Sequence, residues 1–146
     1  MGLKIFKALW FLSVLAVLVN LLLTYISLPE SVVVHDDGPD RIALQRDTFF
    51  YAMTGLLAIV NVMVYFISKA YKTNLDFRAW FHGLVITLNV FFIVATNFIG
   101  LFNSGDRFDY KRIDFIIYGS LGLFVLWIVA WPIYLLYKKF FIKEIV

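Results

Sequence analysis

The residues best suited to chemistry lie together in one polar segment, residues 28–47, with the sequence LPESVVVHDDGPDRIALQRD. Imidazole and carboxylate groups together are ordinary ligands for zinc. The spacing matches no established metal signature, and Gly38-Pro39 among the acids is equally typical of a turn. We therefore predict no metal site, keep His35 as a candidate ligand, and expect a loop that faces a ligand or a partner. The residues of this loop are His35, Asp36, Asp37, Asp40, Arg41 and Arg46.

Catalytic signatures are missing from the rest of the sequence. It contains no Ser–His arrangement, no Glu-x-x-His motif and no glycine-rich phosphate loop. The absence of cysteine excludes disulfides, thiolate metal sites and iron–sulfur clusters. We predict a protein that is not an enzyme and holds no cofactor.

The composition predicts that this loop belongs to an integral membrane protein. Hydrophobic residues make up 62% of the chain and charged residues only 16%, which is too apolar for a soluble domain of 146 residues. Backbone groups in lipid must be paired internally, so each long apolar segment must be helical. We predict one all-α membrane domain, residues 1–146, in which four spans form an up-down-up-down bundle. The spans are residues 5–27, 48–69, 79–101 and 114–137, and the outer loops are 28–47 and 102–113.

Lysine and arginine counts predict the orientation. The N-terminus, the second connection and the C-terminal tail carry eight Lys or Arg and two acids, whereas the outer loops, counted to Asp114, carry five and eight. Cytoplasmic segments are enriched in Lys and Arg, so both termini should be cytoplasmic. We expect a multi-pass protein of the bacterial inner membrane, and the basic residues at span ends do not imply nucleic acid.

A weak internal repeat links the two halves. Shifting the chain by 66 residues places Asp40-Arg41-x4-Arg46-x2-Phe49 over Asp106-Arg107-x4-Arg112-x2-Phe115. One interpretation is two repeated helical hairpins related by a pseudo-twofold axis along the membrane normal. The alternative is a chance match between two similar junctions of loop and helix.

Amides and hydroxyls are the polar groups expected at mid-depth, since no Asp, Glu, Lys or Arg falls near the centre of a span. This absence disfavours pumps and voltage sensors, which use intramembrane charges. Such residues recur every three to four positions on helices one and two, and His82, Asn89, Thr96 and Gly100 form a similar stripe on helix three. We predict intramembrane polar packing between helices, and a polar pocket or water path is the alternative. The amides concerned are Asn20, Asn61, Asn89 and Asn97.

The loop also resembles a known pattern. The residues that carry the likeness are Leu28-Pro29, Val32-Val33-Val34-His35, Gly38-Pro39-Asp40 and Arg46. They resemble the small membrane domain of unknown function at the N-terminus of SdpI-type immunity and signalling proteins. That pattern has Pro at the position of Val33, Phe-Asn at Asp36-Asp37 and Lys at Arg46. The resemblance spans Leu28 to Arg46 and implies a membrane fold and topology more than an activity.

Three hypotheses for function follow. The first is a small non-catalytic inner-membrane protein that serves as an accessory or assembly subunit of a larger complex. The second is an immunity-type or signalling receptor that recognises an external peptide through the loop around His35. The third is an oligomeric pore or small-solute carrier lined by Asn20, Asn61 and Asn89. The expected partners are the lipid bilayer and other membrane subunits, or further copies of the chain.

Overall fold

The computed structural model describes residues 2–37, 39–105 and 114–141, without the side chains of Asp36, Asp37 and Asp114. Four of its helices are long and apolar enough to cross a membrane, as the sequence predicted. Each begins or ends a few residues beyond its expected span, because polar residues at the ends continue the helix. The elements are α1 (Gly2–Ser27), β1 (Ser31–Asp37), β2 (Asp40–Gln45), α2 (Arg46–Ala70), α3 (Leu75–Asn103) and α4 (Asp114–Phe141).

The polar segment between α1 and α2 is a β-hairpin, so the expectations of an all-α chain and of a simple loop are wrong here. Strands β1 and β2 pair antiparallel, with an irregularity between Val33 and His35. Three consecutive valines from Val32 favour extended backbone because β-branched side chains fit a pleated strand. Only Gly38 and Pro39 separate the strands, where a turn was expected, and Gly38 lies outside the described residues.

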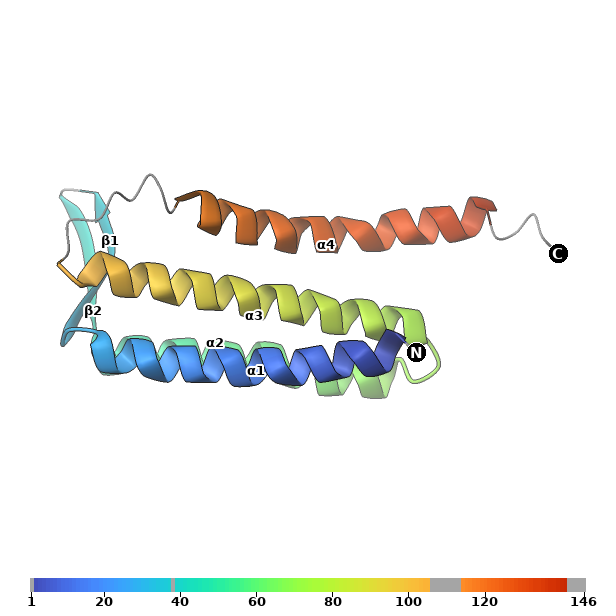
Figure 1. Ribbon diagram of the computed structural model, residues 1–146, viewed down its shortest axis with the longest axis horizontal. Coiled ribbons are helices and arrows are strands. Elements are labelled where there is room, and N and C mark those ends of the chain that lie inside the picture. The colour runs from blue at the N-terminus through green and yellow to red at the C-terminus, as the bar shows by residue number, and fades with distance from the viewer. Residues whose placement is uncertain (1, 38, 106–113, 142–146) are drawn as a thin grey trace.

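Helix α3 occupies the centre of the arrangement. The helices lie lengthwise, with the hairpin at one end and the N-terminus and the α2–α3 connection at the other (Figure 1). The most extensive helix contact joins α1 to α3, and α2 and α4 also pack on α3. The up-down-up-down bundle expected from the sequence places sequential helices next to each other. The α1–α2 contact is instead small, and both helices pack on α3.

The buried core is small and the outside is apolar. One cluster joins Val17 and Leu21 of α1 to Leu57 of α2 and Phe92 of α3, and a second lies beneath the hairpin. Large apolar side chains elsewhere remain exposed, such as Ile26 at 75% and Leu126 at 70%. A surface of this kind suits a lipid environment, where apolar side chains need no burial against protein.

The second half of the predicted repeat cannot be placed. Its loop motif, residues 106–113, lies outside the described residues. In the first half, the corresponding residues form β2 and the first turn of α2. The relation between the two repeated helical hairpins therefore stays a prediction.

Candidate functional site

A pair of amides lies at the centre of the first three helices. Asn61 of α2 and Asn89 of α3 exchange hydrogen bonds, each Nδ2 donating to the other's Oδ1 at 3.1 Å. Asn89 has no exposed surface. A buried amide is costly without partners, so this reciprocal bond fixes the two helices against each other.

Helix α1 completes this central network. The indole Nε1 of Trp10 donates to Asn61 Oδ1 at 2.9 Å, and Asn89 Nδ2 donates to Ser13 Oγ at 3.0 Å. Ser13 in turn donates to the carbonyl of Trp10, and Asn61 Nδ2 also donates to the carbonyl of Leu57. Asn61 and Asn89 thus form hydrogen bonds between helices, and Asn61 also donates within its own helix.

A second polar layer lies nearer the hairpin. Asn20 of α1 donates to Thr96 Oγ1 at 2.7 Å and accepts from Asn97 Nδ2 at 2.8 Å. Thr96 is buried and donates to the carbonyls of its own helix. The structure therefore brings Asn20 and Asn97 together but not with the Asn61–Asn89 pair. The four predicted amides form two separate layers along the α1–α3 contact.

A polar side chain recurs every seventh residue along α3, at His82, Asn89, Thr96 and Asn103. Seven residues complete nearly two helical turns, so these side chains share one face. His82 is buried, its Nδ1 donates to the carbonyl of Arg78 at 2.6 Å, and its ring lies edge to face with the Trp10 ring. The predicted stripe of His82, Asn89 and Thr96 is buried on one face of α3. It continues beyond Gly100 to Asn103.

Asn103 is the residue that the sequence analysis missed. Its Oδ1 accepts from the backbone N–H of Val33 at 2.7 Å, and its Nδ2 donates to the carbonyl of Val33 at 2.9 Å. The side chain thus imitates a neighbouring strand and holds β1 against the end of α3. The seven-residue spacing from Asn89 and Thr96 was the signal that could have found it.

Replacing Asn103 with alanine should release the hairpin. The change removes both bonds to Val33 and leaves the N–H and C=O of Val33 without the Asn103 side chain as partner. The free energy of local opening of the hairpin should therefore fall by about 1–3 kcal/mol. Hydrogen exchange of residues 31–45 should accelerate while exchange in the middle of α3 stays constant. Unchanged protection of β1 would contradict the clamp.

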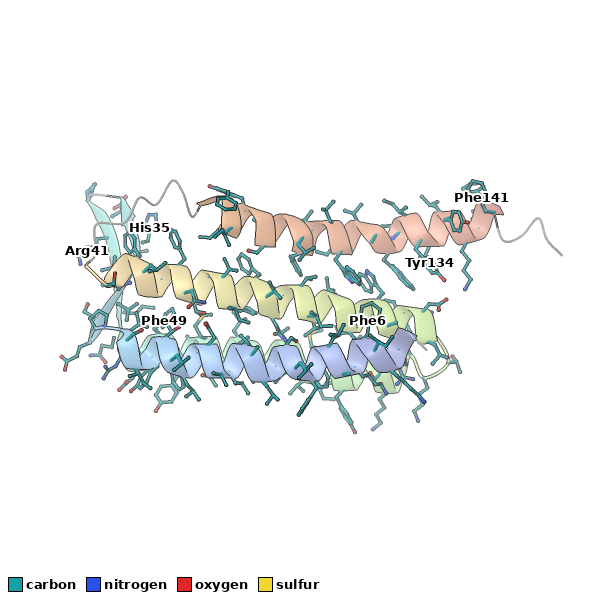
Figure 2. The ribbon with its side chains drawn as sticks, in the orientation of Figure 1. Phe6, His35, Arg41, Phe49, Tyr134 and Phe141 are labelled. Atoms are coloured by element: carbon teal, nitrogen blue, oxygen red, sulfur yellow. The ribbon has the colours of Figure 1, made fainter. Side chains whose placement is uncertain are left out.

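The predicted loop residues lie at the hairpin end of the molecule. His35 is exposed on β1, and Asp40 and Arg41 are exposed on β2. Figure 2 shows His35 and Arg41 at this end. In the strand register Asp36 lies opposite Arg41 and Asp37 opposite Asp40, although the side chains of Asp36 and Asp37 lie outside the description.

Arg46 has a structural position rather than an exposed one. It begins α2, and its Nη1 donates to the carbonyl of Leu28 at 3.3 Å. Its guanidinium lies 4.9 Å from the centre of the Tyr25 ring, and the Tyr25 hydroxyl donates to Asp47 Oδ1 at 2.8 Å. These contacts tie the end of α1 to the start of α2 beneath the hairpin.

Among the described side chains, no group of three or more His, Cys, Asp or Glu is placed to hold a metal ion. Asp36 and Asp37 fall outside that set, so the part of the prediction that concerns His35 with these two acids is untested. The geometry of the described residues therefore gives no support to metal binding at the hairpin.

A different contact attaches α4. Trp80 Nε1 donates to the carbonyl of Trp127 at 2.8 Å, and Trp127 Nε1 donates to the carbonyl of Trp80 at 2.9 Å. Gly83 makes this possible, because a Cβ at that position would overlap the Trp127 ring.

Comparisons of the chain with protein-family models, with curated proteins and with solved structures find no match.

Proposed function

We propose that the chain is a small non-catalytic, multi-pass protein of the bacterial inner membrane, with both termini in the cytoplasm and the hairpin outside. It acts as an accessory or assembly subunit of a larger membrane complex. Its four helices cross the membrane in alternating directions. The hairpin gives the partner a fixed contact surface beyond the lipid.

The central polar network carries this proposal. A pore or carrier needs polar groups that are available to solute, whereas the amides of Asn61 and Asn89 are engaged with each other and with Trp10 and Ser13. Asn89 is fully buried. Polar residues used in this way join transmembrane helices. The network therefore favours a rigid scaffold over the solute-conducting alternative.

The two edges of the hairpin differ, which supports a partner on one of them. Val33 turns both backbone groups toward Asn103 and lies opposite Ala43. In an antiparallel pair, opposite residues direct their backbone groups either both inward or both outward. Ala43 therefore directs its N–H and C=O away from β1, along an edge to which the described residues add no further strand. An extended segment of a partner can add to that edge as a further strand.

Ala43→Pro should weaken partner binding and spare the hairpin. Proline has no N–H to offer an incoming strand, but the outward N–H of Ala43 makes no bond to β1, so the hairpin keeps its ladder. Mild solubilisation and affinity purification of the full chain should recover a stable larger membrane partner. Recovery should fall severalfold in Ala43→Pro and persist in the control Ala43→Val, which retains the N–H. Equal recovery in all three proteins would contradict the use of this edge.

The second candidate function is recognition of an external peptide, as the resemblance to SdpI-type proteins implies. The open edge at Ala43 and the exposed Arg41 and Ile42 favour it, because a peptide could add to β2 in the same manner. The molecules recovered in the affinity purification distinguish the three candidate functions. A membrane protein in the complex supports the accessory subunit, a bound peptide supports the receptor, and a symmetric homo-oligomer with conductance supports the pore.

A further inference from the structure

An apolar groove opens between α3 and α4 at the end of the molecule far from the hairpin. It has a volume of about 290 Å³, and aromatic rings form most of its walls. Figure 2 shows two of them, Phe6 of α1 and Tyr134 of α4, at this end. Trp80, Trp127 and Trp131 are the others, and Asp76 is the one acid in the lining.

A polar hollow adjoins the groove. Its volume is about 410 Å³, and it is lined by the residues that lead into α3, including Thr73 and Asn74, together with Lys138 of α4. Asp76 lines both spaces. The two together form one amphipathic site, apolar toward the membrane interior and polar beyond the end of α3.

The hydrogen bonding of Asp76 leaves one oxygen available. Oδ2 accepts from the Tyr134 hydroxyl at 2.8 Å and pairs with Lys138 Nζ at 3.3 Å. Oδ1 has no hydrogen-bond partner among the described residues. The carboxylate and the Lys138 side chain are each 51% exposed. The site therefore offers Asp76 Oδ1 as an acceptor for a bound cation. The Lys138 ammonium beside it can bind an anion.

The depth of the site matches the lipid headgroups. Tryptophan and tyrosine side chains prefer the boundary between hydrocarbon and water, and this groove gathers three tryptophans and one tyrosine. Asp76 lies in the first turn of α3, just before the apolar span. A molecule that fills both spaces must be apolar at one end and carry both charges at the other.

We propose that this groove binds a phospholipid whose headgroup carries a primary amine, an inference that rests on the proposed membrane location. The ammonium donates to Asp76 Oδ1, the phosphate meets Lys138 and the Thr73 hydroxyl, and an acyl chain lies along the aromatic walls. A quaternary ammonium has no N–H to donate to Oδ1, and a purely anionic headgroup would face the Asp76 carboxylate. The amine-bearing zwitterion complements both charges.

The test measures lipid binding to the purified full chain in detergent by native mass spectrometry. Phosphatidylethanolamine should bind about tenfold more tightly than phosphatidylcholine or phosphatidylglycerol, the ratio expected for one added hydrogen bond to a charged group. Asp76→Asn should remove this preference. Lys138→Ala should weaken all three phospholipids, because each carries a phosphate.

Asp47→Asn is the matched control, since Asp47 also accepts a tyrosine hydroxyl at 2.8 Å but at the hairpin end. It should retain the preference. Equal binding of the three lipids to the wild type, or an undiminished preference in Asp76→Asn, would overturn the proposal. Carbonate extraction and partner recovery, measured on the same variants, report membrane integration and partner binding independently of lipid choice.

Discussion

Asn89→Leu is expected to lower the stability of the helical bundle by about 2 kcal/mol, since the change removes interhelical bonds worth about 0.5–2 kcal/mol each. Asn89 exchanges two bonds with Asn61 and donates a third to Ser13. Leucine leaves Ser13 and the amide of Asn61 with fewer partners in a buried place. Insertion should be unaffected, because leucine partitions into lipid more readily than asparagine.

Thermal denaturation in detergent measures this effect, with membrane integration followed by carbonate extraction. Asn97→Leu is the control, because Asn97 is exposed and has one side-chain bond, to Asn20. It should lower the midpoint by less than half as much. An unchanged midpoint in Asn89→Leu, together with loss of a transport activity, would replace the packing role of Asn89 with a solute pathway.

Gly83→Ala is expected to loosen α4 from α3. Glycine to alanine inside a helix normally stabilises by about 0.5–1 kcal/mol. At this position the new methyl group would overlap the Trp127 ring, which is held by its bonds with Trp80. Overpacking of this kind costs about 1–3 kcal/mol, so the sign of the usual effect should reverse.

Limited proteolysis of α4 and the thermal midpoint measure this reversal. Gly55→Ala is the matched control, since a Cβ at Gly55 meets nothing within 4 Å. The control should be neutral or stabilising, whereas Gly83→Ala should expose α4 and shift the tryptophan emission. Identical behaviour of the two variants would contradict the close α3–α4 contact at Trp127.

The four helices were predictable because a membrane-length apolar segment has few other ways to pair its backbone. Periodicity also indicated the polar face of α3, and Asn89 on that face is buried. The partners of each amide were not predictable, because Asn20 contacts Thr96 and Asn97 only once α1 and α3 are brought together. The pairing depends on which helices are neighbours, and α1 packs mainly on α3 rather than on α2, its neighbour in an up-down-up-down bundle.

The hairpin was missed because its polar residues outweighed its β-branched ones. His35, Asp36 and Asp37 drew attention to metal ligands, while Val32 to Val34 already indicated a strand. An isolated two-stranded hairpin is marginal in water. This one is held by Asn103 from 70 residues away, and the spacing that marks Asn103 does not show that Val33 is its partner.

In the proposed topology the chain crosses the membrane four times and the hairpin lies outside. Reporters that are active in only one compartment, placed after Asp37 and after Val146, test it most directly. The excess of Lys and Arg at the ends of the chain predicts an external reporter after Asp37 and a cytoplasmic one after Val146. Both reporters in the same compartment would contradict the topology and, with it, the outward-facing hairpin.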